Sequence, residues 1–307
     1  MRIAFLGTPE FAVPSLKALW EAGHTLAVFT QPDRPAGRHN RPAPPPAKEF
    51  AQQHDIPVFQ PARIKSEEGV MALHRFAPDL MVTAAFGQLL SKENLDIPPL
   101  GCINVHASLL PKYRGAAPIQ WAIIQGETTT GITTMFTDIG MDTGDILLSD
   151  TIAIEPNETA GELARRLAAL GAKTLMRTLS ALESGELRRI PQNDAQASYC
   201  PMLKKEHGRL DFSQSALAVH NRVRGTNPWP GAYALLGDAP LKFWQTRPLD
   251  ETPPGPPGLC FGSDKSGLFI ACNGGAIEVL ALQLPGGKRL DGKSFLRGKP
   301  ILGQVLT

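Results

Sequence analysis

The amino-acid sequence predicts an α/β protein, in which a doubly wound parallel sheet is followed by a smaller β-rich domain. Short apolar runs alternate with amphipathic segments over the first part of the chain, and Gly and Pro clusters separate short strands in the last part. The 307 residues exceed one ordinary hydrophobic core and suit two domains. We expect an α/β domain over residues 1–190, a linker over 191–206 and a second domain over 207–307.

The first elements predict a βαβ unit. Arg2–Leu6 is a short apolar run, Ala12–Ala22 is amphipathic, and Thr25–Thr30 is a second apolar run. This order implies two parallel strands joined by a right-handed crossover. The alternation continues through predicted helices at 46–54, 67–76 and 159–184, and predicted strands at 58–59, 80–85, 101–106, 130–138 and 145–154.

The second domain shows only short strand candidates, at residues 242–245, 268–272 and 277–284. Clusters of Gly and Pro, such as Pro253–Gly258, separate them. This pattern is typical of a small barrel or sandwich.

Composition and charge exclude some classes of protein. With 42% hydrophobic and 20% charged residues, the chain is not disordered as a whole. Its net charge of +2 hides an asymmetry, because residues 1–200 hold 18 basic and 21 acidic side chains, whereas residues 201–307 hold 13 and 8. The basic last third favours a polyanionic partner.

The sequence predicts no metal site, disulfide scaffold or membrane segment. Four widely spaced cysteines form no CxxC motif: Cys102, Cys200, Cys260 and Cys272. The chain lacks an HExxH motif and any tight Cys/His cluster. Its first apolar run is too short for a signal peptide, and no run approaches membrane-spanning length. We expect a soluble, cytoplasmic protein.

Two common cofactor motifs are also missing. Gly7-Thr8-Pro9 stands where a dinucleotide fingerprint would lie but lacks the GxGxxG glycines, and no GxxxxGK[ST] motif occurs. Neither hydride transfer from NAD nor ATP chemistry is therefore supported.

The segment Gln31–Lys48 is predicted to be a functional loop. It holds Arg34, Arg38 and Arg41 among six prolines, and it follows the carboxyl end of the second strand, where ligands bind in such sheets. A solvated insertion and a phosphate-binding loop both fit this composition.

A pair of polar residues ends a predicted apolar strand. Asn104 and His106 are two residues apart, so their side chains share one face of the strand. An amide and an imidazole side by side can both donate hydrogen bonds to a developing oxyanion. The alternative is that both are hydrogen-bonded core residues, but the pair opens a Pro- and Gly-containing loop, which favours function.

The loop Asp138–Asp145 adds three carboxylates at Asp138, Asp142 and Asp145. Its spacing does not match a calcium-binding loop. One of these carboxylates could hold His106 protonated or accept a proton from a nucleophile. The spacing leaves open which of the three does so.

The chain resembles the formyltetrahydrofolate-dependent formyltransferases, and among them the methionyl-tRNA formyltransferases. The matching segments follow the family's order over nearly the whole chain: 5–11, 30–38, 104–120, 130–146 and 227–232. Small departures occur at Asn40-Arg41, at Phe86 and at Leu89-Leu90-Ser91, where the family often has a second basic residue, a tyrosine and a proline.

The resemblance implies a Rossmann-type catalytic domain joined to an OB-like barrel that binds tRNA. It implies that Asn104, His106 and Asp142 are the catalytic trio, so it selects Asp142 from the three loop acids. It also implies a folate-contacting turn, formed by Ser108, Leu109, Leu110 and Pro111.

The reaction that the resemblance implies transfers a formyl group from 10-formyltetrahydrofolate to methionyl-initiator-tRNA, for translation initiation. The enzyme is expected to act as a monomer without a metal. Arg38 and Arg41 are expected to contact the acceptor end of the tRNA, and Phe11 to line a pocket for the methionine side chain. A formyltransferase for small amines and a non-catalytic RNA-binding protein are the alternatives.

Overall fold

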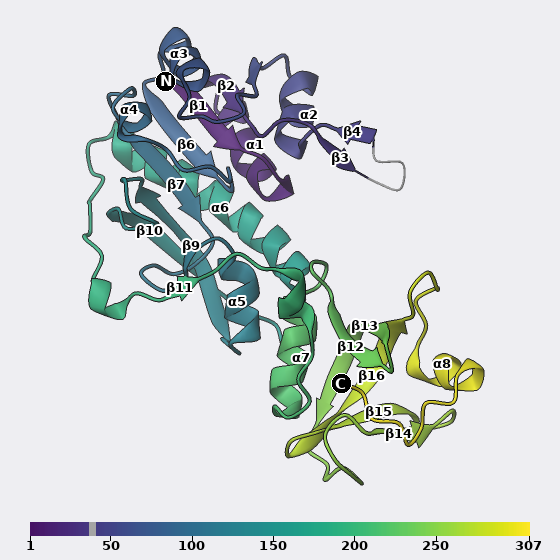
Figure 1. Ribbon diagram of the computed structural model, residues 1–307. Coiled ribbons are helices and arrows are strands. Elements are labelled where there is room, and N and C mark those ends of the chain that lie inside the picture. Colours follow the sequence, from purple (N-terminus) through teal and green to yellow (C-terminus); the bar gives the residue numbers. More distant parts are fainter. Residues whose placement is uncertain (37–40) are drawn as a thin grey trace. The chain divides into compact units, whose positions relative to one another are not determined.

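The computed structural model describes residues 1–36 and 41–307 (Figure 1). The chain forms two compact units. The first consists of residues 1–118, 130–152 and 164–200, and the second of residues 119–129, 153–163 and 201–307. No helix of the described residues is long and apolar enough to span a membrane.

A seven-stranded sheet forms the centre of the first unit, in the order β10-β9-β7-β6-β1-β2-β5. Its strands are β1 (Arg2–Gly7), β2 (Thr25–Phe29), β5 (Val58–Phe59), β6 (Leu80–Ala84), β7 (Cys102–His106), β9 (Thr129–Phe136) and β10 (Ile146–Ala153). The pairs β1–β2, β2–β5, β1–β6 and β6–β7 are parallel, whereas β9 is antiparallel to β7. The predicted α/β class is confirmed, with an antiparallel addition at one side of the sheet.

The helices of the sequence prediction are also present. They are α1 (Val13–Glu21), α2 (Pro46–Gln53), α3 (Glu67–Phe76) and α6 (Ala160–Glu183), with a further short helix, α4 (Lys92–Leu95). Ser66 caps α3 by accepting a hydrogen bond from the Gly69 amide. Thr159 and Glu162 form a reciprocal capping pair at the start of α6.

The core of the first unit explains why its strands have continuous apolar sequences. Ile3 and Phe5 point to one face of β1, Ala4 and Leu6 point to the other, and all four are fully buried. Both faces of the sheet are therefore covered, as parallel sheets require. Helix α6 comes so close to β7 that a Cβ atom on Gly171 would lie 2.8 Å from Val105 Cγ1.

The predicted linker 191–206 includes a two-residue strand that pairs within the first unit. Up to Cys200 these residues belong to that unit, and β11 (Tyr199–Cys200) pairs in parallel with β8 (Arg114–Gly115). Gly115 has a φ of 119°, and a Cβ atom there would lie 2.4 Å from the Cys200 carbonyl oxygen. Only glycine allows the two strands to approach in this way.

The predicted loop at 31–48 contains regular structure. Two short strands, β3 (Arg34–Ala36) and β4 (Arg41–Ala43), pair antiparallel, and α2 begins at Pro46. Lys48 links the two ends of this segment, because its Nζ contacts both carboxylate oxygens of Asp33 at 2.8 Å. Arg38 lies outside the described residues.

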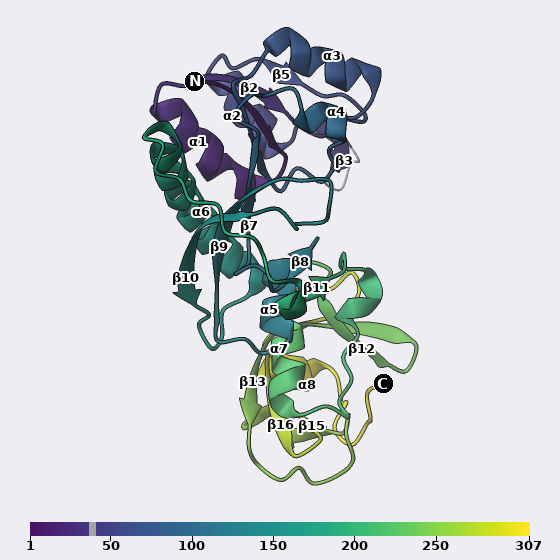
Figure 2. The ribbon, with the colours of Figure 1, turned by 90° about the vertical axis from the view of Figure 1, so that its left-hand side faces the viewer.

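The second unit contains an antiparallel five-stranded sheet in the order β12-β13-β16-β15-β14 (Figure 2). Its strands are β12 (Ala232–Leu236), β13 (Ala239–Leu249), β14 (Cys260–Ser263), β15 (Gly267–Cys272) and β16 (Gly275–Gln283). Its helices are α5 (Pro118–Ile124), α7 (Ala216–Gly225) and α8 (Gly292–Gly298). Val219 and Val223 of α7 join Phe243 and Ile277 in one core, so this β-rich domain agrees with the predicted fold class.

Trp229, between Pro228 and Pro230, is exposed and lies outside the core of the second unit. Its side chain is 53% exposed, although the prolines on both sides suggest a fixed backbone. The core of this unit is filled by Phe212 and Phe243 instead, whose rings lie edge to face at 6.4 Å.

We expect Gly131→Ala to destabilise the first unit. A Cβ atom at this position of β9 would lie 2.1 Å from the Asp150 carbonyl oxygen and 2.5 Å from Leu109 Cδ2. Relieving this overlap should lower the free energy of unfolding by about 1–3 kcal/mol, measured by urea unfolding followed by circular dichroism. Gly298→Ala is the control, because nothing lies within 4 Å of its Cβ position. Equal unfolding midpoints for the two variants would contradict this packing.

Candidate active site

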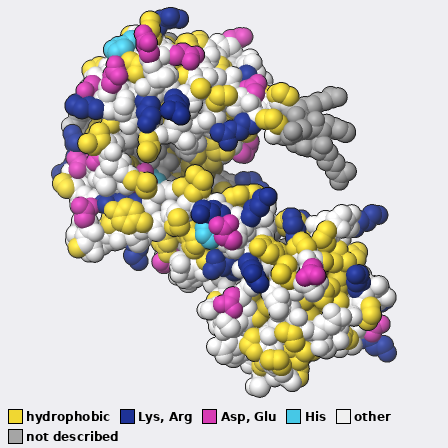
Figure 3. Space-filling view, in the orientation of Figure 1, with side chains coloured by type: hydrophobic (Ala, Val, Ile, Leu, Met, Phe, Trp, Pro, Cys, Tyr) yellow, Lys and Arg dark blue, Asp and Glu magenta, His cyan; other side chains and the backbone are white. Residues whose placement is uncertain are grey.

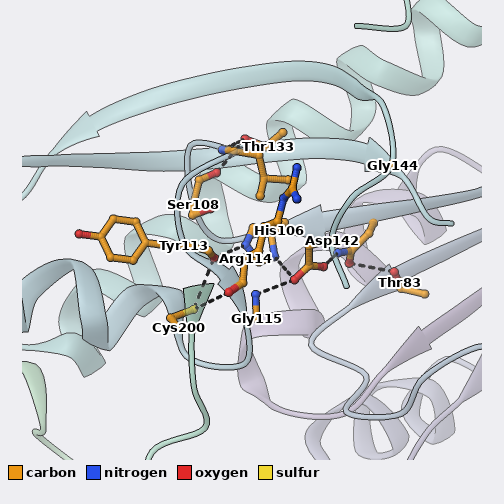
Figure 4. A network of polar contacts seen from close by, with 12 residues as sticks. Thr83, His106, Ser108, Tyr113, Arg114, Gly115, Thr133, Asp142, Gly144 and Cys200 are labelled. Atoms are coloured by element: carbon orange, nitrogen blue, oxygen red, sulfur yellow. Dashed lines mark hydrogen bonds and ion pairs between the residues drawn. The ribbon is translucent and has the colours of Figure 1, made fainter. Parts of the chain in front are cut away.

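His106 is held in one orientation at the carboxyl end of β7 (Figure 4). Its Nε2 donates to the Tyr113 carbonyl oxygen at 3.0 Å, and because a carbonyl can only accept, Nε2 carries the hydrogen. Its Nδ1 lies 3.7 Å from Asp142 Oδ2. The side chain is only 7% exposed, so the ring is buried with both nitrogens facing polar partners.

Asn104 has an equally defined orientation. Its Oδ1 accepts a hydrogen bond of 2.8 Å from the Thr83 hydroxyl on the neighbouring strand β6. The amide nitrogen therefore points the other way, where it lies 3.5 Å from Asp142 Oδ1. The predicted pair does share one side of β7, because both residues reach the same carboxylate.

The three acids of the loop Asp138–Asp145 have different surroundings. Asp138 accepts hydrogen bonds from its own loop, and Asp145 pairs with Arg189 at 2.9 Å. Asp142 instead faces His106 and Asn104, and its Oδ2 accepts a hydrogen bond of 2.8 Å from the Gly115 amide. Of these acids, Asp142 is the one that the structure brings to the pair.

The backbone of Asp142 is in the left-handed region, with a φ of 54°. A residue with a side chain costs about 1–2 kcal/mol in this conformation, so its surroundings must enforce it. Gln192 Nε2 donates to the carbonyl oxygens of Asp142 and Gly144, at 2.8 and 2.7 Å. A Cβ atom on Gly144 would lie 1.8 Å from the Phe136 carbonyl oxygen, so the loop also runs tightly against the end of β9.

The turn after His106 is held by buried hydroxyls. Ser108 Oγ donates to the Lys112 carbonyl oxygen at 2.7 Å. Thr133 Oγ1 donates to the Ser108 carbonyl oxygen and accepts from the Leu110 amide, at 2.7 and 3.2 Å. Of the four predicted folate contacts, Ser108 and Leu110 are buried, whereas Leu109 and Pro111 are partly exposed.

A cysteine next to the site is not a nucleophile. Cys200 Sγ lies 3.4 and 3.3 Å from the carbonyl oxygens of Tyr113 and Arg114, which accept from the thiol. Burial raises the pKa of the Cys200 thiol to about 11, and the charge of Asp142 acts in the same direction. The thiol is therefore protonated near neutral pH, so it has little nucleophilic strength.

The remaining predicted contacts lie apart from this cluster or cannot be placed. Phe11 is half-buried in the short 3₁₀ helix Glu10–Ala12 after β1, which is two strands away from β7 in the sheet. Arg41 begins β4, and its side chain is not described. Within the described part of the chain, no three His, Cys, Asp or Glu side chains lie together as a metal site requires.

Sequence reasoning missed two side chains that orient the cluster. Thr83 is a polar residue inside the apolar run of β6, and this contrast was the available signal. Gln192 lies in the predicted linker, where no periodicity marks it. Thr83 orients the Asn104 amide, and Gln192 binds the backbone of the Asp142 loop. Both contacts join segments that are far apart in the sequence.

Comparisons with known proteins show the family of the chain. Residues 1–179 match the family model described as formyl transferase, and residues 202–300 match the formyl transferase C-terminal domain. The chain is 50% identical to a methionyl-tRNA formyltransferase from Ruminiclostridium cellulolyticum, over 98% of this chain and 97% of the relative. It is 52% identical to a methionyl-tRNA formyltransferase from Pelobacter propionicus, over 97% and 93%.

Solved structures show the same fold at low sequence identity. A sugar 3N-formyl transferase, WlaRD, has a TM-score of 0.69 and 18% identity over 91% of this chain and 97% of its own. An N-formyltransferase from Helicobacter canadensis, solved with folinic acid and dTDP-3-aminofucose, has a TM-score of 0.67 and 18% identity over 90% and 98%. Since the curated relatives match at about half identity over nearly their full length, the chain belongs to the methionyl-tRNA formyltransferase family and is a formyl-transferring enzyme.

Proposed function

We propose that Asn104, His106 and Asp142 transfer the formyl group of 10-formyltetrahydrofolate to the α-amino group of methionyl-initiator-tRNA. The observation that carries the assignment of these residues is their convergence, because an amide nitrogen and an imidazole nitrogen lie 3.5 and 3.7 Å from one carboxylate. These distances are long for hydrogen bonds, so both nitrogens keep hydrogen-bonding capacity for a substrate oxygen, while Thr83 and the Tyr113 carbonyl hold the two side chains in orientation.

The reaction begins with attack of the neutral amine on the formyl carbon. A free α-amino group has a pKa of about 7.7–8.0, so a useful fraction is neutral near pH 7. A carbon–nitrogen bond forms, and the formyl oxygen becomes an oxyanion. Asn104 Nδ2 and the protonated imidazole of His106 stabilise it, each donor contributing roughly 2.7–4 kcal/mol.

Asp142 completes the transfer by charge and proton movement. Its carboxylate stabilises protonated His106, and the Gly115 amide keeps Oδ2 in place at 2.8 Å. The attacking nitrogen loses a proton with the help of Asp142 as the bond between carbon and the folate nitrogen breaks. The proton passes to the folate nitrogen, so the step needs no covalent enzyme intermediate.

We assign the folate and methionine contacts to the segments that follow β7 and β1. We assign folate binding to the turn Ser108, Leu109, Leu110 and Pro111, which continues directly from β7. Leu109 and Pro111 expose the surface that would contact the ligand, while the Ser108 hydroxyl shapes the turn. Phe11 is assigned to a pocket for the methionine side chain at the end of β1.

We assign tRNA binding to two basic regions. Arg38 and Arg41 would contact the acceptor end, and residues 207–307 would bind the body of the RNA, with residues 191–206 joining them to the catalytic domain of residues 1–190. On the face of the second unit seen in Figure 3, Lys and Arg side chains lie around a hydrophobic patch. The enzyme would act as a monomer in the cytoplasm, where translation begins.

We expect His106→Asn to keep the fold and lose most turnover. The variant removes one donor to the oxyanion, so kcat should fall by about 10²–10³-fold in a formylation assay with methionyl-tRNA. His74→Asn, at an exposed position of α3, should behave as the wild-type protein. Offering a nucleotide-linked amino sugar as a second acceptor tests the substrate, and preferential formylation of the sugar would overturn the tRNA assignment.

Asp142→Asn should slow the release of tetrahydrofolate by at least about 10²-fold, because an amide neither stabilises protonated His106 nor accepts a proton. Asp145→Asn is the matched control from the same loop, since Asp145 pairs with Arg189 and does not face the cluster. Spectroscopic detection of tetrahydrofolate with methionyl-tRNA as acceptor measures both variants. If the two variants lose activity equally, Asp142 has no special role.

Binding of tRNA should weaken steeply with salt. A surface that neutralises several phosphates releases counterions, so we expect the dissociation constant for tRNA to rise by more than about 10-fold between 50 and 200 mM salt. The dissociation constant for the folate should change far less over this range. Filter binding with the His106→Asn variant measures the tRNA affinity without turnover, and a flat salt dependence would refute phosphate-driven binding.

A further inference from the structure

We propose that Gln192 is a positioning residue of the active site, which fixes the backbone of Asp142 and is itself anchored by buried Arg114. The inference rests on the proposed role of Asp142 and adds a residue from outside the catalytic loops. Gln192 reaches the site because β11, a few residues further on, pairs with β8.

The side-chain amide of Gln192 uses both of its donor hydrogens and its oxygen in hydrogen bonds. Nε2 donates both hydrogens, to the carbonyl oxygens of Asp142 at 2.8 Å and of Gly144 at 2.7 Å. Oε1 accepts from Arg114 Nε at 3.0 Å and from Arg114 Nη2 at 2.9 Å. A flipped amide is excluded, because it would direct donors at a guanidinium and an acceptor at two carbonyls.

Arg114 is a rigid anchor for this amide. Its side chain is only 1% exposed, and Nη2 also contacts Asp194 Oδ1 at 2.7 Å. Its guanidinium lies 6.0 Å from the centre of the Tyr199 ring, and Nη1 donates to the Tyr199 hydroxyl at 3.4 Å. A planar guanidinium enclosed in this way has little freedom to move.

The Gln192 amide binds the backbone of Asp142, which is in the left-handed region. Gln192 bridges the carbonyl of Asp142, whose φ is 54°, and the carbonyl two residues later. The carboxylate of Asp142 is bound by the Gly115 amide, and Gly115 directly follows Arg114 in the chain. Asp142 is therefore held at its backbone by Gln192, which Arg114 anchors, and at its carboxylate by Gly115, the residue after Arg114.

This arrangement fixes how far the carboxylate lies from its two partners. The Asp142 oxygens are 3.5 Å from Asn104 Nδ2 and 3.7 Å from His106 Nδ1, and no stronger contact with the pair holds them there. A displacement of about 1 Å can cost about 10²-fold in rate. Loss of the Gln192 bridge should thus appear in kcat rather than in substrate binding.

Gln192→Glu is the sharpest single test, because it preserves the side-chain length and both contacts to Arg114. It removes both donors and places a carboxylate oxygen against two carbonyl oxygens. We expect kcat to fall by about 10²-fold, with KM values for folate and methionyl-tRNA within about threefold of the wild-type values. Gln192→Ala should give the same split. Wild-type kcat in Gln192→Glu would overturn the proposal.

Asp194→Asn is the matched control. Asp194 contacts the same guanidinium but no residue of the Asp142 loop, and its side chain is 82% exposed. We expect this variant to keep kcat within about twofold of the wild-type value, as is usual for exposed positions. If Asp194→Asn lowers kcat as much as Gln192→Glu does, the effect comes from general loosening around Arg114, and the proposal fails.

A double-mutant cycle separates positioning from general stability. If Gln192 acts through Asp142, Gln192→Ala should change kcat by less than about threefold in an Asp142→Asn background, although it costs about 10²-fold alone. Additive losses would overturn the positioning role. Wild-type turnover in Asp142→Asn itself would refute the proposed function, whereas impaired Asp142→Asn with unimpaired Gln192→Ala would refute only the inference.

Discussion

Parallel pairing of β6 with β7 is the constraint on which the candidate active site depends. The register sets Thr83 opposite Asn104, and this placement lets the hydroxyl of one strand orient the amide of the next. Because β1 lies beside β6 in the same direction, the loops after these strands emerge at one edge of the sheet. A slip of one residue would turn Asn104 and His106 to the opposite face.

Much of this framework could be predicted from the sequence, because it depends on local patterns. Buried parallel strands appear as continuous apolar runs, and the same-face placement of Asn104 and His106 follows from a spacing of two residues. The choice of Asp142 did not follow from spacing, because three acids share one loop. It depends on a left-handed backbone and on contacts from residues 115 and 192, which no local pattern encodes.

Helix α7 shows a second reason why sequence reasoning falls short. Several of its buried residues are polar, so its apolar periodicity is weak. His220 lies between Thr246 Oγ1 and the Pro156 carbonyl oxygen, and burial lowers its pKa. Arg224 donates to the carbonyl oxygens of Glu155 and Glu158. These partners of His220 and Arg224 are more than 20 residues away in the sequence. When the sequence of α7 is considered alone, its polar residues therefore look like those of a surface helix.

The position of β11 has a consequence for any shortened form of the protein. The α/β pattern ends near residue 190, yet the partners of the buried Arg114 guanidinium come from residues 192–199. A fragment that stops at Ile190 would retain this cation and lose every one of these partners. An unpaired buried charge destabilises a protein by about 3–5 kcal/mol, so such a fragment would fold poorly even though its sheet is complete. A fragment that preserves the first unit should therefore extend at least to Cys200, and a protease cut between Ile190 and Cys200 would separate Arg114 from groups that enclose it.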